Sequence, residues 1–165
     1  MDAELPIVVG HDGSRYAQLA LNRALWLARQ LKVPVHVVRA WSISTAPRPA
    51  TWSPGYVPPA DDFEAAVRER LERDVAAALT DYPDVDVTLF TPHGPPIREL
   101  LKACRGARLV VVGTRGKGGV KDMLMGSVSQ HITHNALTDV LIVRRVSDRD
   151  KDFARRHGMG DILDP

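Results

Sequence analysis

Short runs of apolar, mostly β-branched residues recur along this 165-residue chain and constrain its fold more than any other feature. Four of them lack the polar alternation of a half-exposed strand, and they span 5–10, 33–41, 109–113 and 140–144. Strands of this kind are covered on both faces, and the sheets they form are usually parallel. A fifth run, 85–90, alternates apolar and polar residues and is typical of an edge strand.

Helical patterns separate these runs. Apolar residues recur at helical spacing in four segments, which are 14–31, 62–79, 96–104 and 128–137. We expect Asp61 or Asp62 to cap the second helix, and Pro95 and Pro96 to start the third. Regular alternation of strands and helices predicts one α/β domain with a parallel sheet and right-handed crossovers.

Two segments interrupt or follow this alternation. Residues 42–60 hold five prolines and little periodicity. They form either a lid or a variable connection, and in both cases we expect a mobile loop. Residues 146–165 are dense in charge and have no clear apolar face, which predicts a tail. The chain therefore divides into a domain at 1–145 and a charged C-terminal tail at 146–165.

Composition excludes several classes of protein. A formal net charge of +2 is too small for a nucleic-acid-binding surface. The single cysteine, Cys104, rules out an intrachain disulfide and falls in a helical pattern, where we expect a small buried side chain. No apolar run reaches the roughly 20 residues of a membrane span, and the first residues lack the pattern of a signal peptide. We expect a cytoplasmic protein without nucleic-acid or membrane partners.

Ligands of open α/β sheets bind beyond the carboxyl ends of the strands, so the segments that follow the strands are the candidates for a site. The most informative is 113–119, which holds four glycines in seven residues. Glycine permits a positive φ and lets a ligand approach backbone N–H groups closely. Lys117 and Arg115 add positive charge there.

A helix that starts at Gly126-Ser127 follows this glycine-rich segment. Ser127 and Gln130 have the spacing of a capping box. The free N–H groups and positive dipole of a helix N-terminus suit a phosphate. The alternative is a glycine-rich turn and a capped helix without a ligand.

Other chemistry finds less support in the residues. The P-loop pattern fails because Val111 stands where its first glycine belongs, and the dinucleotide fingerprint fails at Lys121. His131 and His134 share a helix face but lack an evident third metal ligand, so we expect a surface pair and no metal site. His11 has no evident nucleophile or acid partner, so we assign no catalytic residue.

The two ends of the region resemble a universal stress protein (UspA-type) domain over residues 5–145. IVVGHDGS resembles the first β-α unit of that family. The stretch from Gly113 is similar to the family's ATP-binding pattern G-x2-G-x9-G-[ST], with Gly116, Gly126 and Ser127 at the remaining positions. The resemblance implies a Rossmann-like, open parallel five-stranded sheet in the order 3-2-1-4-5, with helices on both faces. It also implies a homodimer.

The resemblance further implies a site for an adenine nucleotide, with ATP as ligand. Val38 would offer backbone groups to adenine. The positions near the ribose and phosphates are Val112, Gly113, Gly116, Gly126, Ser127 and Val128, with Lys117 adding charge. We assign Asp12 to the ribose or to a bound Mg²⁺, because a carboxylate repels phosphate unless a cation intervenes. An N-cap role for Asp12 in the first helix is the alternative.

The resulting hypothesis is an ATP-binding universal stress protein that acts in stress response or signalling. Nucleotide would alter dimer or partner contacts, and the dimer would form through the last strand, because an apolar edge needs a partner. Catalysis would be limited to slow ATP hydrolysis or autophosphorylation. The alternatives are a nucleotide-free interaction module and a weak ATPase or adenylyl-transferring enzyme. Asp122 and Arg39 depart from the family's usual residues.

Overall fold

The computed structural model describes residues 5–116, 125–145 and 156. Its elements in chain order are β1 (Ile7–Gly10), α1 (Arg15–Leu31), β2 (Val35–Val38), α2 (Ala60–Asp81), β3 (Val87–Phe90), α3 (Pro96–Cys104), β4 (Leu109–Gly113), α4 (Ser127–Asn135) and β5 (Asp139–Val143). All strand pairs are parallel, and the order is β3-β2-β1-β4-β5, as predicted. The alternating run at 85–90 forms an edge strand, as expected.

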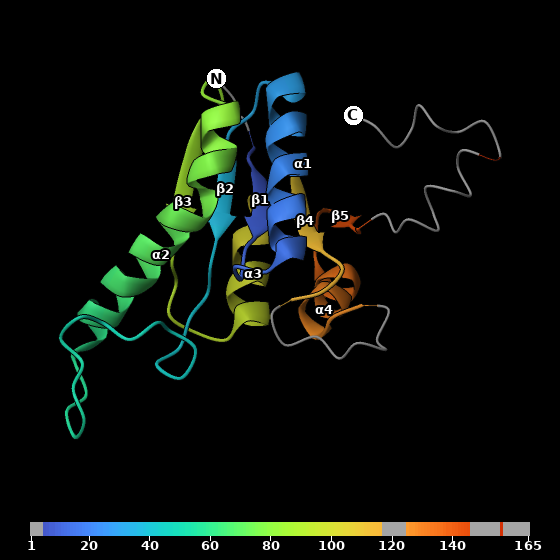
Figure 1. Cartoon of the computed structure of the whole chain (residues 1–165). Helices are drawn as coiled ribbons and strands as arrows, with labels where there is room; N and C mark the ends of the chain where they lie inside the picture. The colour runs from blue at the N-terminus through green and yellow to red at the C-terminus, as the bar shows by residue number, and fades with distance from the viewer. Residues whose placement is uncertain (1–4, 117–124, 146–155, 157–165) are drawn as a thin grey trace.

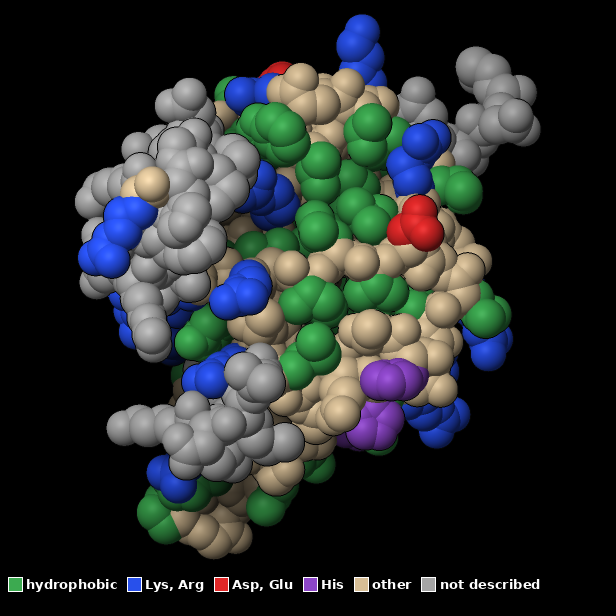
Figure 2. Space-filling model, turned by 90° about the vertical axis from the view of Figure 1, so that its right-hand side faces the viewer, with side chains coloured by type: hydrophobic (Ala, Val, Ile, Leu, Met, Phe, Trp, Pro, Cys, Tyr) green, Lys and Arg blue, Asp and Glu red, His purple; other side chains and the backbone are tan. Residues whose placement is uncertain are grey.

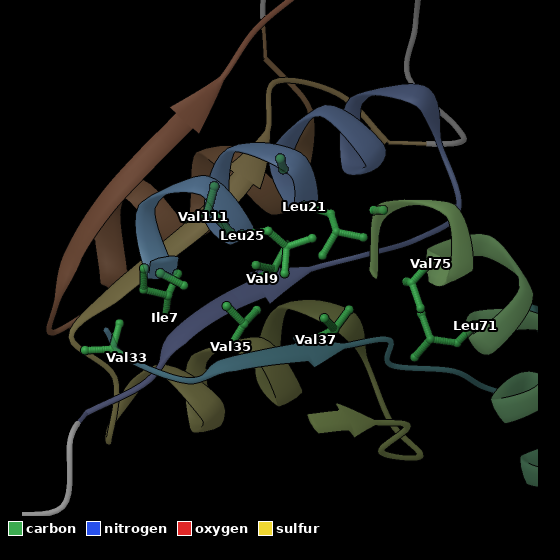
Figure 3. Packing of buried hydrophobic residues seen from close by; sticks show 14 residues of the cluster. Ile7, Val9, Leu21, Leu25, Val33, Val35, Val37, Leu71, Val75 and Val111 are labelled. Atoms are coloured by element: carbon green, nitrogen blue, oxygen red, sulfur yellow. The ribbon is translucent and has the colours of Figure 1, made fainter. Parts of the chain in front are cut away.

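Helices cover both faces of the sheet, α1 and α2 on one face and α3 and α4 on the other (Figure 1). On the first face, side chains from the three inner strands pack against both helices (Figure 3). This cluster includes Ile7, Val9, Leu21, Leu25, Val35, Val37, Leu71, Val75 and Val111. On the second face, Val8, Val110 and Val112 pack with residues of α3 and α4, Cys104 among them. Apolar residues on both sides of each inner strand explain the continuous apolar runs.

The residues at the helix N-termini explain where α1 and α2 begin, and they correct one expectation. Ser14 caps α1, where its Oγ accepts a hydrogen bond from the Ala17 N–H at 3.1 Å. The expectation that Asp61 or Asp62 caps α2 is wrong, because the N-cap is Pro59 and both acids lie in the first turn. The Asp62 carboxylate instead accepts a hydrogen bond from Thr51 at 2.6 Å. Acidic groups in the first turn still interact favourably with the helix dipole.

The second strand is shorter than predicted, and this shapes the end of the sheet. β2 ends at Val38, because β1 ends at Gly10 and leaves the next residues without a partner on that side. The backbone N–H groups of Arg39 and Trp41 still donate toward the β3 side, to Phe90 O at 2.9 Å and Pro92 O at 3.1 Å. A gap therefore opens beside β1 at the carboxyl end of the sheet.

The proline-rich segment 42–60 is anchored at its start and runs out to the projecting N-terminal end of α2 (Figure 1). The anchor is a small apolar cluster of Trp41, Phe63, Val67 and Ala46. The Trp41 indole also donates to Thr91 O at 2.8 Å, so this ring is a structural anchor. The tail predicted at 146–165 lies outside the described residues except for Arg156, and the boundary at 145 stays a prediction. Within the described ranges, no helix is long and apolar enough to cross a membrane.

Candidate functional site

A hollow of about 470 Å³ lies at the carboxyl ends of β1, β2 and β4. This is where the strand order reverses, since β1 is flanked by β2 on one side and β4 on the other. The hollow is walled by the β1–α1 loop, the end of β4 and the N-terminus of α4, with Pro96 and Leu100 from α3. Thr45 is the residue of 42–60 that reaches it. Its lining is mainly apolar with a few polar groups, as in most ligand sites.

The structure brings together eight of the nine residues predicted from the sequence for a nucleotide. Those that line the hollow are Asp12, Val38, Val112, Gly113, Gly116, Gly126, Ser127 and Val128. The ninth, Lys117, lies outside the described residues, as does Asp122. The roles assigned to these residues stay predictions.

Asp12 lies in the loop between β1 and α1 and is not an N-cap. Its Oδ1 accepts a hydrogen bond from the Ser14 N–H at 2.9 Å, while Ser14 itself caps the helix. The N-cap alternative for Asp12 is therefore wrong. Its Oδ2 lies 2.5 Å from the point where a side chain on Gly116 would begin. The carboxylate thus lies directly beside the backbone of Gly116, at the edge of the hollow.

Close approach, and not a positive φ, accounts for glycine at two positions of the pattern, Gly113 and Gly116. Gly113, Gly116 and Gly126 all lie outside the left-handed region. A Cβ on Gly113 would lie 2.6 Å from the backbone oxygen of Tyr16, so this glycine lets α1 pack onto β4. Within the described ranges, a Cβ on Gly126 would make only ordinary contacts, the nearest at 3.4 Å. The expected positive φ is therefore not found at Gly113 or Gly116, the described glycines of the 113–119 segment.

The N-terminus of α4 presents unpaired backbone donors to the hollow. Gly126 is the N-cap and Ser127 the first helical residue, so the capping box predicted for Ser127 is not formed. The first intrahelical donor is the N–H of Gln130, which bonds to Gly126 O. Among the described residues, the N–H groups of Ser127, Val128 and Ser129 have no backbone acceptor. The Gly126 N–H donates to Thr114 O at 2.6 Å and ties the ends of the pattern together.

Ala40 is a site residue that the sequence argument missed in favour of Val38. The Val38 carbonyl already accepts the N–H of His11 at 2.9 Å. Backbone groups of a strand alternate in direction, so Ala40 faces the same side two residues later, where β1 has ended. Ala40 lines the hollow, and within the described part of the chain its N–H and C=O have no hydrogen-bond partner. The two-residue alternation of backbone direction along a strand was the signal that could have identified Ala40.

Behind the β1–α1 loop, Arg39 links His11 to Asp74 of α2. Its guanidinium donates to His11 Nδ1 at 2.7 Å and to the Asp74 carboxylate at 2.8 Å. His11 Nε2 lies 3.4 Å from Gln18 Oε1. Burial, reinforced by the positive charge of Arg39, lowers the pKa of His11 from 6.5 to about 4. Both ring nitrogens are engaged, so His11 has no nitrogen available as a general base.

Two other sequence candidates are structural. His131 and His134 each donate from Nδ1 to a backbone carbonyl of the preceding turn, at 2.8 Å and 2.7 Å. Over the residues described, no group of three potential metal ligands occurs. Cys104 is buried, and burial raises the pKa of its thiol to about 11, which makes it unreactive.

Comparisons with known proteins agree with this geometry. The family model described as "Universal stress protein family" matches residues 5–144. A universal stress protein from Mycolicibacterium smegmatis is 32% identical over 145 residues, covering 87% of this chain and 47% of the relative. The chain thus spans about half the length of the curated relatives it matches.

Solved structures share the fold. A universal stress protein in complex with cAMP superposes with a TM-score of 0.60 and 24% identity, covering 86% of this chain and 98% of that one. A universal stress protein from Archaeoglobus fulgidus in complex with dAMP gives a TM-score of 0.61 and 23% identity, covering 85% and 98%. Taken with the match of the family model over nearly the whole described domain, these findings show that the chain belongs to the universal stress protein family.

Proposed function

We propose that this chain binds an adenine nucleotide, ATP in the first place, in the hollow at the carboxyl ends of β1, β2 and β4. The observation that carries the proposal concerns the described part of the chain: one hollow holds both the α4 N–H groups that lack a backbone acceptor and the unpaired backbone of Ala40. The first set suits phosphate and the second suits a base edge. Two structural neighbours that are complexes with cAMP and dAMP support the same ligand class.

The adenine moiety binds against Ala40 in this proposal. One residue's N–H donor and C=O acceptor match the N1 acceptor and 6-amino donor of adenine. Guanine offers the reverse pattern on its corresponding edge, so the same backbone pair disfavours it. Val38, Leu100 and Val112 supply the apolar surface on which the base rests.

The phosphates bind beside Gly126 at the start of α4, where the backbone N–H groups of Ser127 and Val128 and the positive end of the helix favour an anion. Asp12 accepts hydrogen bonds from ribose hydroxyls, or holds an Mg²⁺ ion that bridges it to the phosphates. Lys117 adds positive charge in the same proposal. ATP binding thereby alters dimer or partner contacts in stress response or signalling, in the cytoplasm.

A matched pair of charge variants tests the phosphate site. Ser127 and Gln130 are both exposed and both lie near the start of α4, but only Ser127 lines the hollow. Glutamate at either position is tolerated by the helix dipole. We expect Ser127→Glu to weaken ATP binding about tenfold or more through charge repulsion, and Gln130→Glu to change it less than about threefold. Adenosine, which lacks phosphate, should bind both variants equally.

The binding itself is checked first on the unmodified chain. Adenine nucleotide released from the purified protein, or an ATP-dependent rise in melting temperature, supports the proposal. An empty protein whose melting temperature ATP leaves unchanged would indicate a nucleotide-free interaction module instead. Equal loss of ATP affinity in both glutamate variants would contradict the assignment of the phosphates to Ser127.

We also propose that the chain forms a homodimer through β5. This strand is at the edge of the sheet, and its residues after Asp139 are apolar and only partly buried. Apolar side chains gather over this edge of the molecule (Figure 2). Leu137, just before the strand, is 89% exposed. An open apolar edge is a ready surface for pairing with a second copy.

A further inference from the structure

Arg39 is a buried cation whose side-chain hydrogen bonds go to His11 and Asp74. It is 9% exposed and is not among the residues that line the hollow. Its Nε donates to the His11 carbonyl at 3.0 Å, and one terminal nitrogen donates to both His11 Nδ1 and Asp74. A fork of donors in fixed geometry is needed for this arrangement, and lysine does not supply it.

These bonds determine the protonation state of His11. Arginine only donates, so His11 Nδ1 must be unprotonated and its proton lies on Nε2, toward Gln18. The same Nδ1 also lies 3.3 Å from the N–H of Gly13, which is consistent with an acceptor. The charged groups around the ring are Arg39, Asp12 and Asp74. His11 is therefore a neutral spacer between Arg39 and the loop.

The loop held in this way carries Asp12. Arg39 binds the residue before Asp12 through both its carbonyl and its ring, while Ser14 N–H holds the carboxylate from the other side. On the α2 side, Asp74 is shared by Arg39 and Arg70, the latter at 3.2 Å. The loop between β1 and α1 is thus fastened to α2 through one side chain.

We propose that Arg39 is a positioning residue for nucleotide binding, which acts through His11 to hold the Asp12 carboxylate where it meets the ligand. The inference rests on the proposed nucleotide site and deepens it, because it names a residue that determines affinity without touching the ligand. It also explains why a charged side chain is buried at the end of a strand, where its desolvation needs compensation by several hydrogen bonds.

A double-mutant cycle on ATP affinity tests the proposal. Arg39→Met should weaken ATP binding about tenfold in the unmodified chain, and Asp12→Asn should also weaken it. In the Asp12→Asn background, Arg39→Met should have less than about a threefold further effect, because its action passes through that carboxylate. Equal losses in both backgrounds would show a general structural role and overturn the proposal.

Two further variants make the cycle interpretable. Arg70→Met removes the other arginine on Asp74 without touching His11, and we expect ATP affinity to be unchanged. Arg39→Lys retains the charge but loses the fork, and it should behave like Arg39→Met. This variant also carries the test if Arg39→Met fails to fold. An ATP affinity of Arg39→Lys equal to that of the unmodified chain would contradict the proposal.

The link between Arg39 and His11 has a readout that does not need ATP. NMR of the imidazole nitrogens should show the Nε2–H tautomer in the unmodified chain, and loss of Arg39 should raise the pKa of His11 from about 4. If ATP does not bind but this titration behaves as expected, the nucleotide site fails while the Arg39–His11 link stands. If the titration is insensitive to Arg39, the positioning proposal fails even where ATP binds.

Discussion

Gly113 shows at the scale of one residue how a glycine can belong to a ligand pattern and still be needed for packing. A Cβ there would lie 2.6 Å from Tyr16 O and 2.7 Å from Tyr16 C, both backbone atoms that cannot rotate away. The contact joins the start of α1 to the end of β4. The requirement for glycine therefore comes from packing within the chain itself.

A pair of alanine variants distinguishes this packing role. We expect Gly113→Ala to lower the free energy of unfolding by about 1–3 kcal/mol, because overpacking forces the backbone to shift. Gly106→Ala is the control, since no atom of the described residues lies within 4 Å of a Cβ at that position. Chemical denaturation at constant pH measures both. Equal stability of the two variants would show that α1 adjusts freely at Tyr16.

Site residues were predictable from sequence where they follow a fixed spacing along the chain. Gly116, Gly126 and Ser127 follow one spacing pattern, and each lines the hollow. Arg39 and Ala40 were not predicted as site residues, because their roles depend on where β1 ends beside β2. Partners of a side chain such as Asp74, 35 positions away, are set by tertiary packing and leave no local pattern.

At the scale of elements, strand existence and order were predictable, while strand ends were not. The apolar run 109–113 matches β4 residue for residue, since β5 pairs with it along its whole length. The run 33–41 shrinks to Val35–Val38 because pairing with β1 stops there. The order of the strands came from the family resemblance and not from periodicity, which does not specify which strands are neighbours.

The exposed edge at β5 leads to a prediction about assembly. We expect Leu137→Lys to weaken dimerisation about tenfold or more, because a charge would be buried against the second copy. Ile43→Lys is the matched control, as Ile43 is also exposed, at 52%, but lies in the 42–60 segment. Sedimentation velocity over a concentration series measures the dissociation constants. A monomeric unmodified chain would contradict the dimer itself.

At the scale of the whole molecule, His11 couples global stability to pH. Its pKa is 6.5 when exposed and about 4 in the folded chain, so between these values the unfolded state binds more protons. The free energy of unfolding therefore falls as pH falls from 6.5 toward 4. Below pH 4 the contribution of His11 stays constant. The lowered pKa of Asp74 contributes only further down, as pH falls below 3.8.

We expect the free energy of unfolding to fall by about 2 kcal/mol between pH 7 and pH 5 from His11 alone. Denaturant titrations at the two pH values measure the loss. His11→Asn does not titrate in this range, and its amide oxygen can still accept from Arg39. The variant should therefore lose much less stability over the same interval. An equal loss in both proteins would assign the effect to other groups.

The contact between Gly113 and Tyr16 bears on how motifs are used to infer ligands in other chains of this fold. In this chain the glycine at the end of β4 is explained by the helix that lies close against that strand, so its presence alone is no evidence for a nucleotide. Packing against the described residues does not demand glycine at Gly126, because a Cβ there would make only ordinary contacts with them. A search for nucleotide binders should weight the later glycine more than the earlier one.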